Sequence, residues 1–380
     1  MRIAVIGGGP GGLYFAYLWK RRHPDAVVEL FEQNPAGATW GFGVVFSDQA
    51  LEFLRADDPE TVDAIAPNME GWKNITLNLH GESIEIDGVG FSSIGRLALL
   101  SLLQERVRAV GVVTQFDRAI QSVDALQGLQ QGYDLIVAAD GLNSLVRRSF
   151  EGDFGTSLSY SSNKFAWYGT PRRFETLSQT FVKTERGAFN AHHYRYSPTM
   201  STFLVECDRA TWQAYGFASK DAEQSKAVCE EVFAETLGGQ PLISNKSAWR
   251  NFPWIWNEHW SFRNMVLIGD ALHSAHFSIG SGTRLAIEDA IALTKALEAE
   301  AHVATALCRY EAERKPIVKK LVTAARTSGE WYEKFPEHMK LELMDFAYSY
   351  ITRSGRIDDA RLRAMSPSFM AGYEASRSKP

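Results

Sequence analysis

The sequence predicts an α/β protein in which a Rossmann-like dinucleotide-binding domain is combined with a second domain built on an antiparallel sheet, so that the whole molecule has an α+β two-domain arrangement. Three observations support this fold class. An apolar run at the N-terminus stops at a cluster of glycines, and two later apolar runs stop at Asp-Gly or Gly-Asp pairs. Four closely spaced β-rich runs between residues 164 and 207 have no helical pattern between them.

The N-terminal run and its glycines form the first element. Residues 3–6 suit a strand buried on both faces, and Gly7, Gly9 and Gly12 follow in the pattern G-x-G-x-x-G. The first glycine permits a tight turn, the second lets a pyrophosphate approach the backbone, and the third lets the next helix pack closely on the strand. Residues 13–22 are predicted to form that helix, whose N-terminus carries no acidic side chain and therefore offers an anion site.

A second apolar run, residues 27–31, ends at Glu32, twenty residues after Gly12. An acidic residue at that distance is expected to bind a ribose hydroxyl group. The order of strand, turn, helix, strand and acid predicts adenine dinucleotide binding, and by itself it leaves both NAD and FAD open.

Two more predicted strand ends carry ligand-binding signals. Residues 133–139 form a predicted buried strand that ends at Asp140, and residues 265–268 form one that ends at Gly269 and Asp270. In open α/β sheets, ligands bind at the carboxyl ends of the strands. The glycine-rich loop 273–283 then opens a helix, which presents a second helix N-terminus to a ligand. Signals so far apart in the sequence predict one long ligand that reaches all of them.

The β-rich runs predict the second domain. Residues 164–168, 180–183, 189–196 and 202–207 follow one another too closely for intervening helices, which favours antiparallel pairing. We expect residues 1–160 to form the dinucleotide-binding domain, 161–258 the substrate-binding sheet domain, 259–310 the completion of the first domain, and 311–380 a C-terminal helical segment. Residues 72–88 are predicted to form a hairpin that joins the substrate sheet, and the apolar stretch 40–46 is predicted to lie against a ligand or between the domains.

Composition narrows the function classes. The chain has 380 residues and a net charge of -5, which disfavours general binding to nucleic acid or to a membrane surface. It shows no signal peptide and no stretch long enough to span a membrane. The three cysteines are widely spaced and predict neither a disulfide framework nor a metal site, so we expect a cytoplasmic protein, either a monomer or a homodimer.

The glycine and aspartate motifs, taken in order, resemble the fingerprint of the class A flavoprotein monooxygenases, the single-component aromatic hydroxylases. The matching residues are 7–12, 140–144 with Arg147, and 269–273. This resemblance implies a p-hydroxybenzoate hydroxylase-like fold and non-covalently bound FAD. It also implies hydroxylation of an aromatic ring through a flavin hydroperoxide, with NADH or NADPH as the transient reductant and O2 as co-substrate.

Further stretches are similar to a subgroup that hydroxylates aryl-CoA thioesters such as salicylyl-CoA and 2-aminobenzoyl-CoA, namely residues 41–48, 276–283 and 346–349. Residues 164–170, 199–207 and 249–252 are also similar to the protodeoxyviolaceinate monooxygenases. The broad family usually has a proline shortly after the Gly-Asp-Ala-x-His stretch, and this chain, like the subgroup, lacks it. The alternatives are a hydroxylase of a free indole-type or other aromatic metabolite, and a non-catalytic carrier built on the flavin scaffold.

The resemblance assigns residues to the cofactor and to the reacting ring. It implies that Gly7, Gly9, Pro10 and Gly12 bind the FAD pyrophosphate, that Glu32 and Gln33 lie at the adenosine ribose, and that Arg96 and Asp270 lie at the ribityl region. Asp140 and Gly269 would support the site, and Gly280, Gly282 and Thr283 would bring a helix N-terminus to the flavin. The catalytic-site residues are then expected to be His276, Phe277 and Gly280.

The substrate residues are predicted from charge and strand pattern. If the substrate is a CoA thioester, its phosphates need cations, and Lys164, Arg172, Arg173 and Arg195 are the candidates, although such charges more often form a solvated face. His192 and His193 are adjacent in a predicted strand and point to opposite faces, so one of them can face a ligand cavity, although a packed or solvated strand histidine is the more common outcome. No metal is expected, because His273 and His276 lack further ligands nearby.

Overall fold

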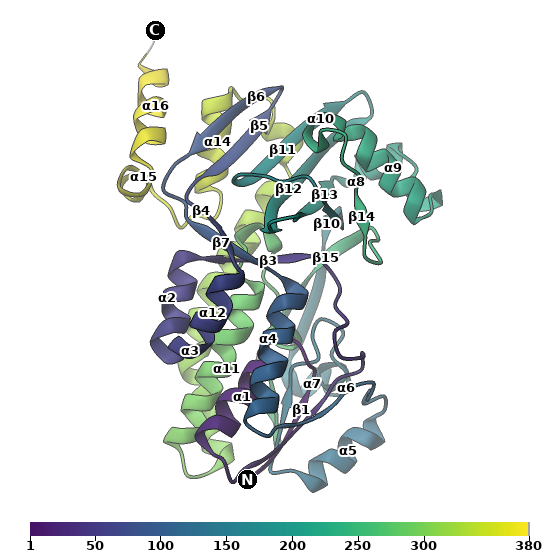
Figure 1. Ribbon diagram of the computed structural model, residues 1–380, viewed down its shortest axis with the longest axis vertical. Helices are drawn as coiled ribbons and strands as arrows, with labels where there is room; N and C mark the ends of the chain where they lie inside the picture. Colours follow the sequence, from purple (N-terminus) through teal and green to yellow (C-terminus); the bar gives the residue numbers. More distant parts are fainter. Residues whose placement is uncertain (379–380) are drawn as a thin grey trace.

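The structure, a computed structural model, describes residues 1–378. The chain forms an elongated molecule with two lobes, and the N-terminus and the C-terminal helices lie at opposite ends of it (Figure 1). The first lobe is built on a mainly parallel sheet and the second on a mainly antiparallel sheet. Within the described residues, no helix is both long and apolar enough to cross a membrane.

The first lobe contains a six-stranded sheet in the order β16-β17-β9-β1-β2-β8, in which every neighbouring pair is parallel except β16 with β17. Its central strands are apolar and buried on both faces, as parallel strands covered by helices require. Because β17, β9 and β1 are neighbours, their carboxyl ends meet at one edge and bring the three predicted motifs together. The bounds are β1 (Arg2–Ile6), β2 (Val27–Phe31), β8 (Val113–Gln115), β9 (Leu135–Ala138), β16 (Ser261–Phe262) and β17 (Met265–Leu267).

Helices surround this sheet. The first, α1, begins directly after the glycine turn and packs against α4 and α11. Asp58 separates the helices α2 and α3. Its carboxylate caps α3 by accepting a hydrogen bond from the amide of Thr61. The bounds are α1 (Pro10–Arg22), α2 (Asp48–Asp57), α3 (Pro59–Ile65), η1 (Ala66–Asn68), α4 (Arg96–Ala109), α5 (Val123–Gly132), α6 (Leu145–Ser149), α7 (Glu151–Phe154) and α11 (Gly282–Ala299).

The second lobe contains a sheet in the order β14-β10-β13-β12-β11-β5-β6, with β15 also paired to β10. The four predicted β-rich runs pair antiparallel, as expected, and only β5 and β11 run parallel. The strand β10 crosses the predicted domain boundary at residue 160. The bounds are β5 (Ile75–Leu79), β6 (Glu82–Ile86), β10 (Thr156–Thr170), β11 (Leu177–Thr184), β12 (Gly187–Ser197), β13 (Met200–Cys207), β14 (Ile243–Ser244) and β15 (Arg250–Asn257).

A small three-stranded sheet, β3-β7-β4, lies between the lobes. The amide of Gly43 donates to the hydroxyl of Thr202 at 2.9 Å, and the hydroxyl of Tyr194 donates to the carbonyl of Gly43 at 2.9 Å. The apolar stretch 40–46 is therefore fastened to the antiparallel sheet, at the position between domains that its composition predicts. The bounds are β3 (Gly43–Ser47), β4 (Glu70–Trp72) and β7 (Phe91–Gly95).

The C-terminal part of the chain is helical and joins the two lobes. The long helix α12 places Tyr310 and Val318 in the core of the first lobe and Trp331 and Tyr332 in a second core beneath β5 and β11. The bounds are α12 (Val303–Tyr332), α13 (Phe335–His338), α14 (Leu343–Thr352), α15 (Asp359–Met365) and α16 (Pro367–Arg377). Four shorter elements complete the second lobe: α8 (Arg209–Ala214), η2 (Phe217–Ser219), α9 (Ala222–Val232) and α10 (Ala234–Leu237).

Two glycines next to the β5-β6 hairpin differ in what surrounds them. Gly88 has a φ of +71°, and a Cβ atom on it would overlap the carbonyl oxygen of Met365, between α15 and α16. Gly81 also has a positive φ, +81°, but a Cβ atom on it would meet nothing within 4 Å. Only Gly88 therefore combines left-handed backbone with close packing against the C-terminal helices.

Gly88→Ala is expected to lower the free energy of unfolding clearly more than Gly81→Ala. Both variants force alanine into left-handed backbone, at a cost of about 1–2 kcal/mol, and only Gly88→Ala must also displace the chain between α15 and α16. Urea unfolding followed by circular dichroism measures both variants. Equal losses of stability would contradict the packing described for Gly88.

Candidate active site

A cavity of about 900 Å³ lies between the two lobes, a volume within the usual range for small-molecule sites. The stretch before β3 and the region from Asp270 to Thr283 form one side of it. Strands of the antiparallel sheet, β15 and residues of α14 form the other side. The cavity thus lies at the carboxyl-end edge of the parallel sheet.

The glycine turn leaves one side of its backbone open. A Cβ atom on Gly7 would overlap the carbonyl oxygen of Ala139, and one on Gly12 would overlap the carbonyl oxygen of Gly7. A Cβ atom on Gly9 would meet nothing within 4 Å. Gly9 is the N-cap residue of α1, and Pro10 is the first helical residue. The turn is tight where it must pack and open where a pyrophosphate would approach.

Glu32 closes the same turn from the end of β2. Its carboxylate accepts hydrogen bonds from the amide of Gly8 at 2.6 Å and from the amide of Asn34 at 2.8 Å. Gln33, between them, is exposed. The acid predicted to bind a ribose therefore lies directly beside the glycine turn.

The second motif is coupled to the third through Arg147. The carboxylate of Asp140 accepts from the amide of Leu145 at 2.7 Å, at the start of α6, while its other oxygen has no hydrogen-bond partner among the described residues. Burial raises the pKa of Asp140, and hydrogen bonds from Ser144 and Leu145 act against this rise. The buried guanidinium of Arg147 donates to the carbonyl of Ala271 at 2.9 Å. The ends of β9 and β17 are thereby held together.

A buried ion pair holds the third motif. Asp289 of α11 accepts hydrogen bonds from the amide of Gly269 at 3.0 Å and pairs with His273 at 2.8 Å and with Arg314 of α12 at 2.9 Å. Burial on its own would raise the pKa of Asp289, but His273 and Arg314 lower it, so the carboxylate stays ionised. This cluster fixes the turn η3 (Gly269–Ala271) against both helices.

Arg96 and Asp270 both line the cavity. The guanidinium of Arg96 donates to the hydroxyl of Thr39 at 3.1 Å and forms no ion pair within residues 1–378. Burial lowers the pKa of Arg96, and the charge of Asp270 acts against this. Burial raises the pKa of Asp270, while the charges of Arg96 and His273 oppose the rise. The pair presents both a donor and an acceptor to a ligand.

The loop before α11 offers an open helix N-terminus. Gly280 has a φ of +60°, and a Cβ atom on it would lie 2.6 Å from the side chain of Val45. The next glycine, Gly282, starts α11 and has free space on its Cβ side. The N-cap residue Ser281 makes no capping hydrogen bond, and the first turn contains no acidic residue. Gly280, Gly282 and Thr283 line the cavity, so the positive end of α11 faces it.

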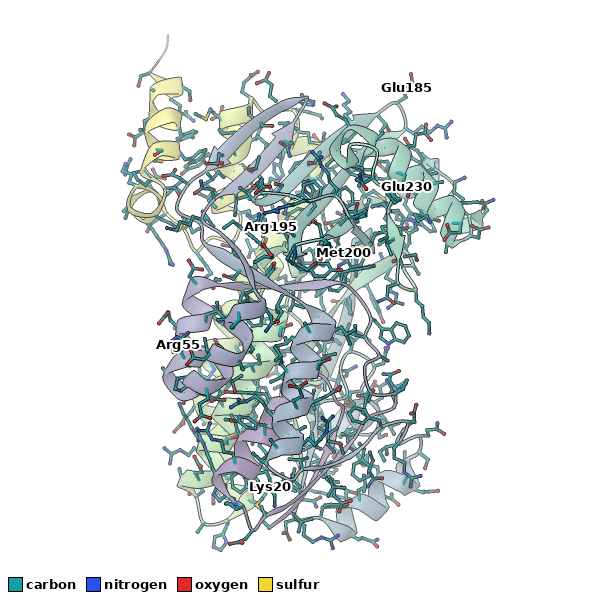
Figure 2. All side chains as sticks on the ribbon, viewed as in Figure 1. Lys20, Arg55, Glu185, Arg195, Met200 and Glu230 are labelled. Carbon is teal, nitrogen blue, oxygen red and sulfur yellow. The ribbon has the colours of Figure 1, made fainter. Side chains whose placement is uncertain are left out.

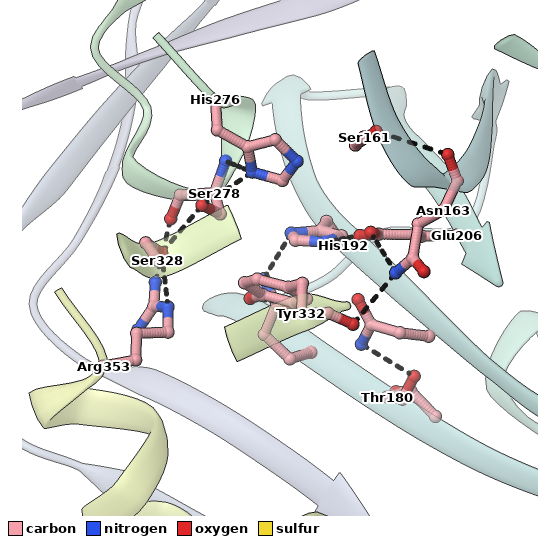
Figure 3. A network of polar contacts seen from close by, with 12 residues as sticks. Ser161, Asn163, Thr180, His192, Glu206, His276, Ser278, Ser328, Tyr332 and Arg353 are labelled. Atoms are coloured by element: carbon pink, nitrogen blue, oxygen red, sulfur yellow. Dashed lines mark hydrogen bonds and ion pairs between the residues drawn. The ribbon is translucent and has the colours of Figure 1, made fainter. Parts of the chain in front are cut away.

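His276 belongs to this loop, but its side chain does not line the cavity. Its Nδ1 is 2.8 Å from the hydroxyl of Ser278, which is 2.8 Å from the hydroxyl of Ser328 in α12 (Figure 3). Arg353, at the end of α14, donates to the hydroxyl of Ser328 at 3.0 Å and to the carbonyl of Ser278 at 2.8 Å. This network ties the loop to the C-terminal helices, while Phe277, next to His276, lines the cavity.

His192 lines the cavity and belongs to a second buried network (Figure 3). Its Nδ1 is 2.9 Å from the amide nitrogen of Gln179, and its Nε2 is 3.4 Å from Glu206. Glu206 also accepts a hydrogen bond from Asn163 at 2.9 Å. Burial raises the pKa of Glu206, against the effects of His276 and Asn163, and burial lowers the pKa of His192 to about 3. The histidine is therefore neutral near neutral pH.

The cations predicted for a CoA phosphate do not line the cavity. Lys164 donates to the side chain of Asn251 at 2.6 Å, and Arg172 and Arg173 are exposed. Arg195 is buried at the junction of the small and antiparallel sheets (Figure 2), where it pairs with Glu70 at 2.8 Å. Of the five predicted substrate residues, His192 is the one that the structure brings to the cavity.

Sequence reasoning missed several residues that line the cavity. Gln179, Lys246, Tyr350 and Arg353 belong to no local motif. Arg148 directly follows Arg147, and Arg250 lies within the stretch 249–252, but neither position indicated a cavity-lining cation. The resemblance at residues 346–349 is the signal in the sequence that points to α14. It stops before Tyr350 and Arg353, which are the residues of this region that line the cavity.

The comparisons with known proteins agree with this geometry. A family model described as "FAD binding domain" matches residues 128–325. The chain is 40% identical over 365 residues to a salicyloyl-CoA 5-hydroxylase of a Streptomyces species, covering 93% of this chain and 70% of the relative. It is 38% identical over 357 residues to the 3-hydroxy-4-methyl-anthranilyl-[aryl-carrier protein] 5-monooxygenase of Streptosporangium sibiricum, covering 94% and 95%.

Two further comparisons extend the likeness. The protodeoxyviolaceinate monooxygenase of Chromobacterium violaceum is 33% identical over 374 residues, covering 97% of this chain and 96% of the relative. The solved tetrameric form of 2-methyl-3-hydroxypyridine-5-carboxylic acid oxygenase shares the fold, with a TM-score of 0.72 at 18% identity, covering 96% of this chain and 95% of that one.

The second and third strand-end motifs contribute Leu142, Asn143, Arg147 and Asp270 to the cavity wall, and the glycine turn follows the neighbouring strand β1. This arrangement is typical of a flavin-dependent oxidoreductase. The comparisons then place it: the chain belongs to the class A flavoprotein monooxygenases, and it is an FAD-dependent aromatic hydroxylase. The predicted p-hydroxybenzoate hydroxylase-like fold and the FAD cofactor are confirmed. The residues present fit FAD, because the open side of Gly9, the unpartnered oxygen of Asp140, the unpaired Arg96 and the uncapped end of α11 suit an extended, anionic ligand.

Gly9→Ala is expected to leave the apoprotein folded but to raise the dissociation constant for FAD at least about tenfold, equivalent to about 1.4 kcal/mol. The added methyl group meets no protein atom, yet it occupies the side from which the pyrophosphate would approach. Flavin fluorescence titration and thermal unfolding of the apoprotein measure the two effects. Gly128→Ala in α5, whose added Cβ also meets nothing within 4 Å, is the control and should bind FAD normally; unchanged affinity in Gly9→Ala would refute this view of the turn.

Proposed function

We propose that the protein hydroxylates the ring of an aryl thioester, with NADH or NADPH as the reductant and O2 as co-substrate. The shape of the cavity carries this proposal. One end is enclosed by the buried residues His192 and Leu204 and the half-buried Phe277, and the same cavity continues to exposed residues such as Tyr160 and Lys246. A ring can lie at the enclosed end while a long chain attached to it leads to the surface. The names of two relatives, one specifying a CoA substrate and one an aryl-carrier protein, support the same class.

The enclosed end is suited to a neutral aromatic ring. Burial lowers the pKa of His192 to about 3 and that of His276 to about 4, so neither histidine carries charge near neutral pH. Phe277 contributes an apolar wall, and Arg353, which also lines the cavity, is held by Ser278 and Ser328. We propose that His192 and Phe277 contact the ring, and that His276 positions the loop that carries Phe277 and Gly280.

The cofactor would be held along the edge of the parallel sheet. Gly7, Gly9, Pro10 and Gly12 with the start of α1 would hold the pyrophosphate, Glu32 with Gln33 the adenosine ribose, and Arg96 with Asp270 the ribityl region. Asp140 and Gly269 would support these contacts. Bound FAD would supply the oxygen-transfer chemistry, with electrons from NAD(P)H and oxygen from O2.

The chain itself would stabilise negative charge on the bound group and exclude water from it. The N-terminus of α11, at Gly282 and Thr283, directs unpaired backbone amides into the cavity, where they stabilise negative charge on a bound group. The loop around Phe277, fastened from behind by His276 and Arg353, covers the enclosed end and limits access of water. We further infer that the protein works in the cytoplasm, where acyl thioesters and NAD(P)H are available, as a monomer or homodimer.

The decisive assay offers FAD-loaded protein salicylyl-CoA, 2-aminobenzoyl-CoA, the two free acids and indole, with NADH or NADPH. Because thioester substrates alone use the whole length of the cavity, kcat/KM for a thioester is expected to exceed that for its free acid at least about tenfold, or about 1.4 kcal/mol. Product mass should show one added oxygen. Equal values for acid and thioester would argue for a free aromatic substrate, and flavin that NAD(P)H cannot reduce would argue for a carrier.

A further inference from the structure

The exposed part of the cavity wall is formed by residues to which the proposed function assigns no contact with the ligand. We call this the rim and define it as Trp40, Arg148, Leu158, Tyr160, Lys246 and Arg250. Its residues come from separate parts of the chain: the loop before β3, α6, the first half of β10, and the turn that leads into β15. All six are exposed, and all six line the cavity that also contains the open end of α11.

The rim combines exposed apolar surface with unpaired positive charge. Trp40, Leu158 and Tyr160 are 47%, 49% and 62% exposed, and all three line the same cavity. Arg148, Lys246 and Arg250 form no ion pair with any acidic residue in the part of the chain that the structure describes. The Nζ atom of Lys246 lies 4.0 Å from the ring centroid of Trp40, in a cation–π contact.

The segment that carries Lys246 is fastened in place. The side-chain amide of Asn245 donates to the carbonyl oxygens of Thr39 and Gly41, each at 3.1 Å, and the hydroxyl of Ser247 donates to the carbonyl of Trp167. These contacts join the turn before β15 to the loop that carries Trp40. The part of the rim formed by Trp40 and Lys246 is thus held in place before any ligand binds, which reduces the entropy lost on binding.

The charges around the cavity exceed what the cofactor needs. Among the described residues, six basic and two acidic side chains line it: Arg96, Arg147, Arg148, Lys246, Arg250 and Arg353, with Glu151 and Asp270. Arg96 lies by Asp270, and Arg147 is engaged with backbone carbonyls, so both belong to the strand-end motifs. Lys246 and Arg250 lie in the turn and strand of the second lobe. Their charge calls for a second anion beyond the FAD pyrophosphate.

We propose that the rim binds the phosphopantetheine arm of the thioester substrate, with Lys246 and Arg250 on its phosphate and Trp40, Leu158 and Tyr160 against its apolar segments. Ammonium and guanidinium groups form strong charge-assisted hydrogen bonds to phosphate oxygens. The same arm occurs in coenzyme A and on carrier proteins, and the rim recognises the chemistry that the two share. The inference rests on the proposed function and adds to it the residues that distinguish a thioester from a free acid.

The test compares the double variant Lys246→Ala/Arg250→Ala with the wild type on one aryl group carried by three arms: pantetheine, phosphopantetheine and coenzyme A. Removing two phosphate contacts is expected to raise KM for the two phosphate-bearing thioesters at least about tenfold. KM for the aryl-pantetheine, KM for NADH and kcat are expected to stay within about twofold, because none of them depends on the arm's phosphate. The control Lys319→Ala/Lys320→Ala removes two exposed cations of α12 that do not line the cavity, and it should match the wild type throughout.

Two results would overturn the proposal. An equal rise in KM for aryl-pantetheine would show that the variant disturbs the cavity as a whole, and a rise confined to KM for NADH would show that the rim serves the reductant. An aryl-carrier protein, assayed beside aryl-CoA, distinguishes the two sources of the arm.

A binding measurement separates this inference from the proposed function. Free coenzyme A is titrated into FAD-loaded protein by calorimetry, with and without the double substitution. If thioesters are not hydroxylated but coenzyme A binds at least about tenfold more weakly to the double variant, the proposed function fails and the rim assignment stands. If coenzyme A binds both proteins equally, the rim assignment fails whatever the substrate is.

Discussion

The ion pair between Asp289 and Arg314 is the interaction on which the site most depends. It joins α11 to α12, and the same carboxylate holds His273 and the amide of Gly269. A buried carboxylate that loses its cation costs about 3–5 kcal/mol, so this pair commits the chain to one arrangement. The turn after β17 and the start of α11 are thereby set at fixed positions, and these two elements border the cavity where the cofactor must lie.

A second set of contacts completes the enclosure from the other end of α12. This helix runs from the core of the first lobe to that of the second. Near its second end, the hydroxyl of Ser328 accepts a hydrogen bond from Arg353, which follows α14, and forms another with the hydroxyl of Ser278 in the loop. These hydrogen bonds fix the loop to α12 and to Arg353. Residues of the same loop form part of the cavity wall. Buried polar networks thus fix the loop, while Phe277 and Ile279 of the same loop face the cavity.

The parallel sheet, the three strand-end motifs and the antiparallel second sheet could be predicted because they follow local rules of pattern and spacing. Gly7, Gly12 and Gly269 each have a backbone reason to be glycine that the sequence motif already encodes. The cations that line the cavity in the second lobe could not be predicted in this way. Arg195 pairs with Glu70, which is 125 positions away, and Lys246 reaches the cavity in a turn whose Asn245 is hydrogen-bonded to the loop that carries Trp40. Such pairings are set by tertiary packing, which no local pattern records.

The central claim is that one cavity holds the flavin at the N-terminus of α11 and leads the substrate's arm out past the rim. A crystal structure of the protein with FAD and a non-reactive aryl-CoA analogue tests it most directly. The account predicts the flavin ring beside Gly280 and Gly282, the aryl ring beside His192 and Phe277, and the phosphate next to Lys246 and Arg250. A flavin bound away from α11, or a thioester arm that leaves the cavity elsewhere, would contradict it.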